Sequence, residues 1–116
     1  MSTAQYPVNE YDHYHAHLYY DEKSWPIAEQ LLLTIEEQMH YKVGRRHKKC
    51  VGPHPMWSCQ VSFDKQSFDG LIPWLDEQRE GLSVLVHPIT GNDLVDHTDL
   101  ACWLGEPVAL KLKMFQ

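Results

Sequence analysis

The stretch DHYHAHLYYD (residues 12–21) alternates two kinds of side chain along its length. Successive residues of a β-strand point to opposite faces of a sheet, so this period of two predicts a strand. His13, His15 and His17 then share one face. The alternate positions carry apolar and aromatic side chains that suit a hydrophobic core: Tyr14, Ala16, Leu18 and Tyr20. One face of this strand is therefore expected to pack inside the protein, and the other to be rich in imidazole.

The remaining chain supplies helices and strands to surround this segment. The hydrophobic pattern predicts helices over residues 23–41 and 67–80, and strands over 45–51, 56–63 and 82–88. The resulting order of strand, helix, strand, strand, helix, strand is that of the split βαβ, or ferredoxin-like, fold. We therefore predict an α+β fold with a four-stranded antiparallel sheet, both helices on one face and the histidines on the open face. The first and third strands should lie in the middle, with the fourth beside the first.

The C-terminal part of the chain is expected to form a turn and a short helix within residues 90–107. A last strand is predicted over residues 108–115. No repeat, linker or low-complexity stretch divides the sequence. Because 116 residues suffice for one hydrophobic core and little more, a single domain over residues 1–116 is predicted.

Composition narrows the classes of function. The formal charge of −6 at pH 7 argues against nucleic acid as a partner, because phosphate binding needs a basic surface. No apolar run approaches the roughly 20 residues that cross a bilayer, and no signal-peptide pattern is recognisable. The three cysteines have no regular spacing and are expected to be reduced thiols. These features predict a cytoplasmic protein that binds neither nucleic acid nor membrane.

The histidines are the unusual feature, since there are eight in 116 residues. The apolar side of each predicted strand must face the helices, which leaves the histidines of residues 12–21 beside His87 on the open face. Neutral imidazole is a common ligand for zinc, iron, copper and nickel. We predict His15, His17 and His87 as metal ligands; the alternative is that they are ordinary surface histidines. No nucleophile elbow, phosphate-binding loop or dinucleotide fingerprint accompanies them.

Three segments extend this picture: YHAHLYYD (14–21), VGPHPMWSCQVSF (51–63) and LSVLVHPITGNDLVDHTDLACWLG (82–105). In this order they resemble the DOPA 4,5-dioxygenase family of small bacterial and fungal proteins. The resemblance implies a ferredoxin-like fold and a mononuclear non-haem Fe(II) enzyme. Such an enzyme uses O₂ to open a catechol such as L-DOPA to a semialdehyde by extradiol cleavage. The family's histidines correspond to these residues: His15, His17, His54, His87 and His97.

The chemistry that the resemblance implies assigns roles to these residues. Fe(II) must bind the catechol and still leave a position for O₂, so the protein can supply only about three ligands. A nearby histidine that is not a ligand could accept or donate a proton, and His54 and His97 are predicted in this catalytic role. The predicted substrate-binding residues are Ser58, Gln60 and Tyr19.

Two points stay open at the level of sequence. Many non-haem iron oxygenases use two histidines and one carboxylate, yet no Asp or Glu falls on the predicted open face. Either the site has three histidines, or a carboxylate such as Asp96 or Asp99 reaches it from the C-terminal part. Zinc suits three histidines equally well.

Two other functions therefore compete with the dioxygenase. One is a zinc-bound or metal-free module that binds a small molecule. The other is a structural dimer whose open face is its interface, with histidines that make the contact sensitive to pH. A homodimer is expected, and it is compatible with all three functions.

Overall fold

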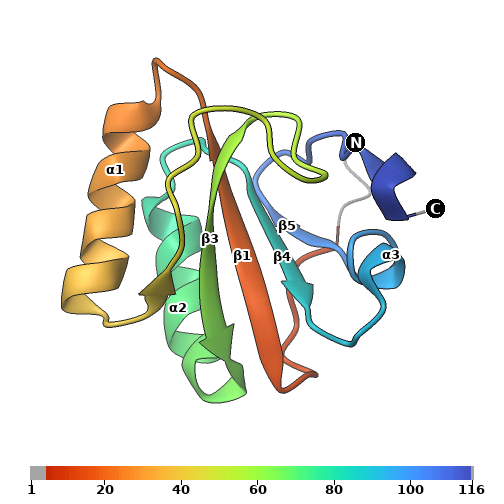
Figure 1. The fold of residues 1–116 in the computed structure, drawn as a ribbon. Coiled ribbons are helices and arrows are strands. Elements are labelled where there is room, and N and C mark those ends of the chain that lie inside the picture. The colour runs from red at the N-terminus through yellow and green to blue at the C-terminus, as the bar shows by residue number, and fades with distance from the viewer. Residues whose placement is uncertain (1–4, 116) are drawn as a thin grey trace.

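The computed structural model describes residues 5–115, which form one sheet flanked by two main helices (Figure 1). The strands are β1 (His13–Tyr20), β2 (Lys42–Val43), β3 (Trp57–Asp64), β4 (Val84–Pro88) and β5 (Cys102–Leu104). The longer helices are α1 (Trp25–Leu33), which continues as the π-helical turn η1 (Thr34–Gln38), and α2 (Lys65–Gln78). The shorter ones are α3 (Asp93–Asp96) and the 3₁₀ turn η2 (Leu112–Phe115).

The sheet has the strand order β2-β3-β1-β4-β5, and every neighbouring pair is antiparallel. The predicted α+β fold is confirmed, with β1 and β3 adjacent in the middle and β4 beside β1. The strand count differs from the prediction, because β5 adds a fifth strand to the outer edge of β4.

The core lies between the sheet and the two helices. The predicted apolar face of β1 is buried, and it contacts the apolar faces of α1 and α2. The hydroxyls of two tyrosines in this layer form hydrogen bonds at its margins. The Tyr20 hydroxyl donates to the backbone carbonyls of His47 and Ser58. The Tyr14 hydroxyl accepts from the backbone N–H of Glu10. The members of this core from the strands are Tyr14, Ala16, Leu18, Tyr20, Cys59, Val61, Phe63, Val84, Val86 and Leu104.

Local sequence explains where the helices begin. Asp64 is the N-cap of α2, and its carboxylate accepts a hydrogen bond of 3.0 Å from the backbone N–H of Ser67. Pro26 lies in the first turn of α1, where no backbone hydrogen bond is lost. Pro73 lies inside α2 on its exposed side.

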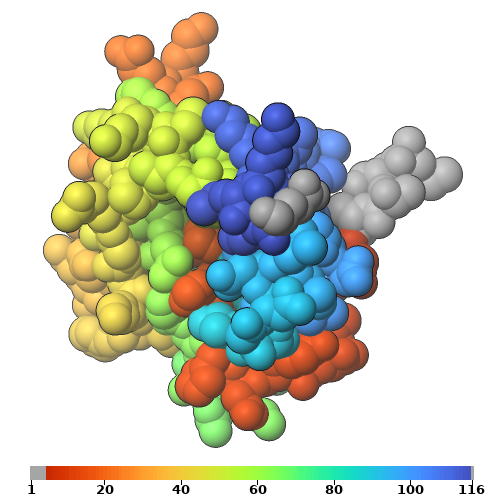
Figure 2. Space-filling model, turned by 45° about the vertical axis from the view of Figure 1, so that its right-hand side comes forward, coloured from red at the N-terminus to blue at the C-terminus, as the bar shows by residue number. Residues whose placement is uncertain are grey.

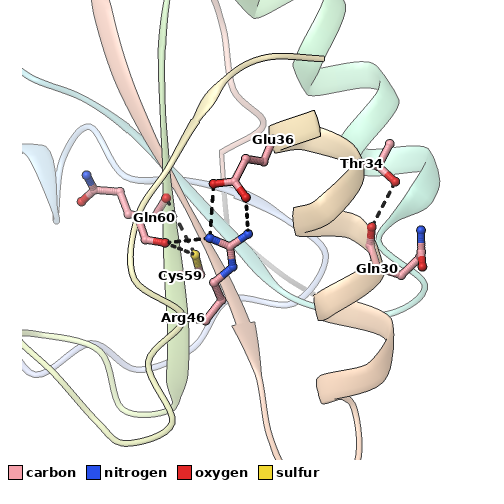
Figure 3. A network of polar contacts seen from close by, with 7 residues as sticks. Gln30, Thr34, Glu36, Arg46, Cys59 and Gln60 are labelled. Atoms are coloured by element: carbon pink, nitrogen blue, oxygen red, sulfur yellow. Dashed lines mark hydrogen bonds and ion pairs between the residues drawn. The ribbon is translucent and has the colours of Figure 1, made fainter. Parts of the chain in front are cut away.

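The strand predicted over residues 45–51 is wrong, since β2 ends at Val43. After β2 the chain runs along β3 but bonds to it only at intervals. The N–H of Gly44 donates to the Gln60 carbonyl, and the N–H of His47 donates to the Ser58 carbonyl. Side chains take the place of a regular ladder. Arg46 makes an ion pair of 2.9 Å with Glu36 of η1 and also donates to the Gly44 carbonyl (Figure 3). The Tyr20 hydroxyl donates a hydrogen bond to the His47 carbonyl.

The strand predicted over residues 108–115 is also wrong. The outer edge of β4 is occupied instead by β5, which lies within the residues predicted to form a turn and a short helix. Val108 and Leu110 instead pack on a second apolar cluster formed by Tyr19, Leu85 and Ala101 on the sheet face away from the helices. The chain then ends in the turn η2.

The sheet face away from the helices is the histidine face, as predicted, although the chain after β4 covers part of it. In Figure 2 the orange-red surface of β1 is seen in a hollow between the yellow-green loop before β3 and the blue segments around α3 and η2. The fold therefore leaves a recess over the centre of the sheet.

Within the described residues, no helix is both long and apolar enough to cross a membrane.

Candidate metal centre

Three histidines from two neighbouring strands meet in this recess. The β1–β4 register places His15 directly opposite His87, and His17 points to the same face two residues further along β1. Each of the three side chains offers a ring nitrogen, and these atoms all lie within 4.8 Å of one another. Antiparallel pairing therefore brings His87 against the half-buried His15 and the buried His17, which precede it by 70 or more residues in sequence.

His17 and His87 form the tightest pair of this group. Their Nε2 atoms are 3.0 Å apart, and both side chains are buried. His87 Nδ1 lies 2.9 Å from the carbonyl oxygen of Pro88. A carbonyl only accepts hydrogen bonds, so Nδ1 carries the proton, and the lone pair of His87 is on Nε2, facing His17. A backbone partner for the second ring nitrogen is the usual support of a metal-bound histidine.

The donor set fits a transition-metal ion. Metal–imidazole bonds are about 2.0–2.1 Å long, so nitrogens 3.0 Å apart can both reach one ion. Burial lowers the pKa of His15 and of His17, and lowers that of His87 to about 4, with neighbouring histidines adding to the shift in each ring. All three imidazoles are therefore neutral at neutral pH, which is the form that binds a metal.

Neither of the two carboxylates considered from the sequence belongs to this group. Asp96 is buried, but Oδ1 accepts from the Thr90 hydroxyl at 2.6 Å and Oδ2 from the Thr90 N–H at 3.0 Å. Asp99 is exposed, and its carbonyl accepts from Gln5. Among the described residues, the group that could hold a metal thus consists of three histidines.

His54 lies beside the three histidines and is held from several sides. Its ring centroid is 4.4 Å from that of His17, and Pro53 and Pro55 restrict its backbone. Its Nδ1 is 2.7 Å from the hydroxyl of Tyr19. Burial lowers the pKa of His54 to about 4 and raises that of Tyr19 well above its ordinary value, so both groups are neutral at pH 7.

His97 approaches from the opposite side, directly after α3. Its Nδ1 is 2.7 Å from the Asp93 carbonyl oxygen, so Nδ1 donates and Nε2 carries the lone pair. Its ring lies 4.3 Å from that of His87 and stacks on Phe115 of η2 at 4.7 Å. The turn that follows β4 therefore returns a second non-ligand imidazole to the recess.

A cavity of about 230 Å³ connects these groups. It is lined by all five histidines that the family resemblance singled out, together with Gln60, Asp93, Asp96, Phe115, Pro53 and Ile89. A second cavity of about 180 Å³ adjoins it and shares His17, His54 and Gln60. It extends the recess towards Ser58 and His47. The combined space suits a molecule of about one ring with a polar substituent.

The predicted substrate-binding residues lie in different places. Gln60 lies on the cavity wall, with its amide nitrogen 3.3 Å from His15 Nε2, and Ser58 lines the adjoining cavity. Tyr19 is buried, and its hydroxyl contacts His54 and not the cavity. The role of Tyr19 in substrate binding stays a prediction, and the contact that the structure gives its hydroxyl is with His54.

Three further aromatic and histidine residues, Trp57, Trp103 and His13, lie outside the cavity. Trp57 packs with the core on the helix side, and Trp103 stacks on Tyr19 at 6.1 Å. His13 shares the face of His15 but is exposed and outside the cavity.

Phe115 and Asp93 were missed by sequence reasoning. A strand was expected where Phe115 lies, and the role of Asp93 is a backbone carbonyl, which leaves no signal in residue type. The short helix predicted within residues 90–107 does form, as α3, with Asn92 as its N-cap.

Known proteins share this fold and sequence pattern. A family model described as the Dopa 4,5-dioxygenase family matches residues 14–114. The crystal structure of a proposed dioxygenase from Nostoc punctiforme superposes with a TM-score of 0.85 at 38% sequence identity, covering 89% of this chain and 90% of that one.

Two curated relatives come from fungi, and both are longer than this chain. An uncharacterized 21.2 kDa protein of Botryotinia fuckeliana is 32% identical over 110 residues, which cover 84% of this chain and 60% of the relative. The DOPA 4,5-dioxygenase of Amanita muscaria is 36% identical over 62 residues, covering 53% of this chain and 27% of that protein. The chain therefore spans less than two thirds of the length of either relative.

Proposed function

Since this chain belongs to the Dopa 4,5-dioxygenase family, we propose that it is a non-haem Fe(II) enzyme that opens a catechol ring with O₂. The proposed substrate is L-DOPA or a related catechol, and the product a semialdehyde formed by extradiol cleavage. The observation that carries the proposal is the group of His15, His17 and His87, whose nitrogens lie within 4.8 Å of one another at the floor of a cavity. These neutral residues would hold the iron.

Iron, when bound, would bring catechol and O₂ together and mediate the electron transfer between them. The protein contributes the proton transfers. His97 Nε2 carries a lone pair because Nδ1 donates to the Asp93 carbonyl, so it can accept the proton of a catechol hydroxyl. His54 Nε2 carries a proton if the Tyr19 hydroxyl donates to Nδ1, so it can donate to an oxygen of the substrate.

The walls of the recess would orient the ring. Phe115 stacks on His97 at one side, and the second cavity lies at the other. In that second cavity Ser58 and Gln60 offer a hydroxyl and an amide to a polar substituent of the ring. We assign both to substrate binding, with the burial of the cavity floor limiting access of water to the reacting oxygens.

A zinc-bound module that binds small molecules is the second candidate. It is favoured by the histidine-only donor set, which suits zinc as well as iron. We also propose that the protein forms a homodimer and is located in the cytoplasm.

The test is anaerobic reconstitution of the chain with Fe(II), followed by L-DOPA and then air at neutral pH. We expect a yellow ring-opened product that forms with Fe(II) and not with Zn(II). Catechol and hydroquinone are the matched pair of test compounds. The hydroxyls of catechol are vicinal and those of hydroquinone are not, and only vicinal hydroxyls allow this cleavage. Binding of L-DOPA without product in the iron-loaded chain would favour the second candidate.

A further inference from the structure

We propose that Tyr19 is a positioning residue that fixes His54 as the Nε2–H tautomer, so that this histidine presents a hydrogen-bond donor to the cavity. The tautomer itself follows from the geometry alone. Its consequence for turnover rests on the proposed function.

The contact joins two buried groups from different parts of the chain. Tyr19 Oη is 2.7 Å from His54 Nδ1, and 35 residues separate the two in sequence. Their side chains are 1% and 6% exposed, so water does not compete at this contact. A hydrogen bond of this length in a dry environment imposes a strong preference on which partner donates.

The direction of the bond follows from satisfying both groups. If His54 Nδ1 donated to the tyrosine oxygen, the phenolic hydrogen would need an acceptor of its own. Within residues 5–115, the partner found for this hydroxyl is His54 Nδ1. A buried hydroxyl left without a hydrogen bond costs about 1–3 kcal/mol. Tyr19 therefore donates, and the proton of the neutral imidazole is on Nε2.

Neither partner is free to rearrange. The ring of Tyr19 stacks on Trp103 at 6.1 Å and belongs to the apolar cluster on the histidine face. The backbone N–H of His54 donates to the Val51 carbonyl, and the following backbone is restricted by proline. The orientation of the His54 ring is thus set by its surroundings, and its Nε2 is the polar ring atom left for the cavities that it lines.

The result is a pair of histidines with opposite tautomers. The Asp93 carbonyl makes His97 an Nδ1–H imidazole with a lone pair on Nε2. Tyr19 makes His54 the reverse, with a proton on Nε2. One ring can therefore accept a proton from a bound hydroxyl while the other donates a hydrogen bond, and neither needs to be charged. A cleavage that removes and returns protons is served by this difference.

The first test is direct detection of the tautomer by long-range ¹H–¹⁵N NMR on the full chain without metal. We expect His54 to show a protonated Nε2 and an unprotonated Nδ1. In Tyr19→Phe the Nδ1 signal should shift and a population protonated on Nδ1 should appear, because the ring of phenylalanine keeps the packing but donates nothing to Nδ1. Tyr14→Phe is the matched control: it removes a buried tyrosine hydroxyl from the other face of the same strand and should leave the His54 signals unchanged.

The second test is kinetic and uses the iron-loaded chain. Tyr19→Phe should lower kcat roughly tenfold while KM stays within about twofold, and iron content should stay that of the unmodified chain. A protonated Nδ1 in the unmodified chain, or His54 ring signals that stay unchanged in Tyr19→Phe, would overturn the positioning role. Because NMR reads the tautomer without turnover, it distinguishes failure of this inference from failure of the proposed reaction.

Discussion

His17 Nε2 lies 3.0 Å from His87 Nε2, although 70 residues separate them in the sequence. The β1–β4 register pairs His17 with Leu85 and His87 with His15, so the two rings approach diagonally across the ladder and stack at 5.1 Å. Without an ion, one Nε2 must carry a proton and donate to the other. A metal ion can replace that proton and accept both lone pairs, with His15 completing the group.

His87→Ala should abolish this arrangement. It removes one nitrogen of the pair and leaves His17 without its partner, so we expect the dissociation constant for Zn(II) or Fe(II) to rise by more than about 100-fold. Competition with a chromogenic chelator measures it, anaerobically for Fe(II). His13→Ala is the matched control, since His13 lies on the same face of β1 but is exposed and outside the cavity. Metal affinity of His87→Ala equal to that of the control would refute the ligand assignment.

Gln60→Glu tests how the site treats a carboxylate. The Gln60 amide nitrogen is 3.3 Å from His15 Nε2, so glutamate would place a negative charge beside the three imidazoles. We expect metal affinity to increase roughly tenfold, because a nearby anion stabilises the bound cation. Turnover should fall, because the same charge would repel the oxygens of a deprotonated catechol.

Gln60→Ala separates charge from contact in that experiment. It removes the amide without adding charge, so its metal affinity should stay close to that of the unmodified chain. Tighter metal binding in Gln60→Ala than in Gln60→Glu would show that the amide obstructs the ion, and that charge has little influence there.

Asp96→Asn distinguishes a structural carboxylate from a metal ligand. Both Asp96 oxygens accept hydrogen bonds from Thr90, and asparagine would turn a donor towards one of these donors. We expect unfolding in urea to show a loss of about 1–3 kcal/mol, since a buried group loses its partner. The metal dissociation constant should change by less than about threefold. A 100-fold loss of metal affinity, with the folded state intact, would instead make Asp96 a ligand.

Much of the fold could be predicted because the alternation of apolar residues and histidines in the first half of β1 is regular. Tyr14, Ala16 and Leu18 had to face a core, and that requirement placed His15 and His17 on the other side of the sheet. The two wrong strands have different causes: residues 108–115 find the sheet edge already paired with β5, and residues 45–51 are held by side-chain contacts. Residues 45–51 look like a strand, but the hydroxyl of Tyr20 and the ion pair of Arg46 occupy them instead. Neither contact is visible in a period of two.

The candidate site was predictable in its residue types but not in its support. The spacing of the histidines on the two adjacent strands predicted that they share one face, and the family motifs added His54 and His97. The carbonyls of Pro88 and Asp93, which set two of the tautomers, leave no trace in the sequence because any residue has a carbonyl. The position of Phe115 was hidden by a further cause. It depends on β5 occupying the sheet edge, which is a competition between two distant segments.

His97→Ala provides the test of the proposed base. The substitution removes the lone pair on Nε2 and leaves a space beside Phe115 and His87, while all three predicted ligands remain in the chain. Iron affinity should stay within a few-fold, while kcat for L-DOPA falls about 10²–10⁴-fold, the usual contribution of a positioned base. Because His97 is only half-buried, free imidazole can enter that space, and we expect millimolar imidazole to restore part of the lost rate. The same imidazole should not restore His87→Ala, in which iron is lost. A full rate in His97→Ala without imidazole would exclude His97 as the base and leave the proton to bulk water.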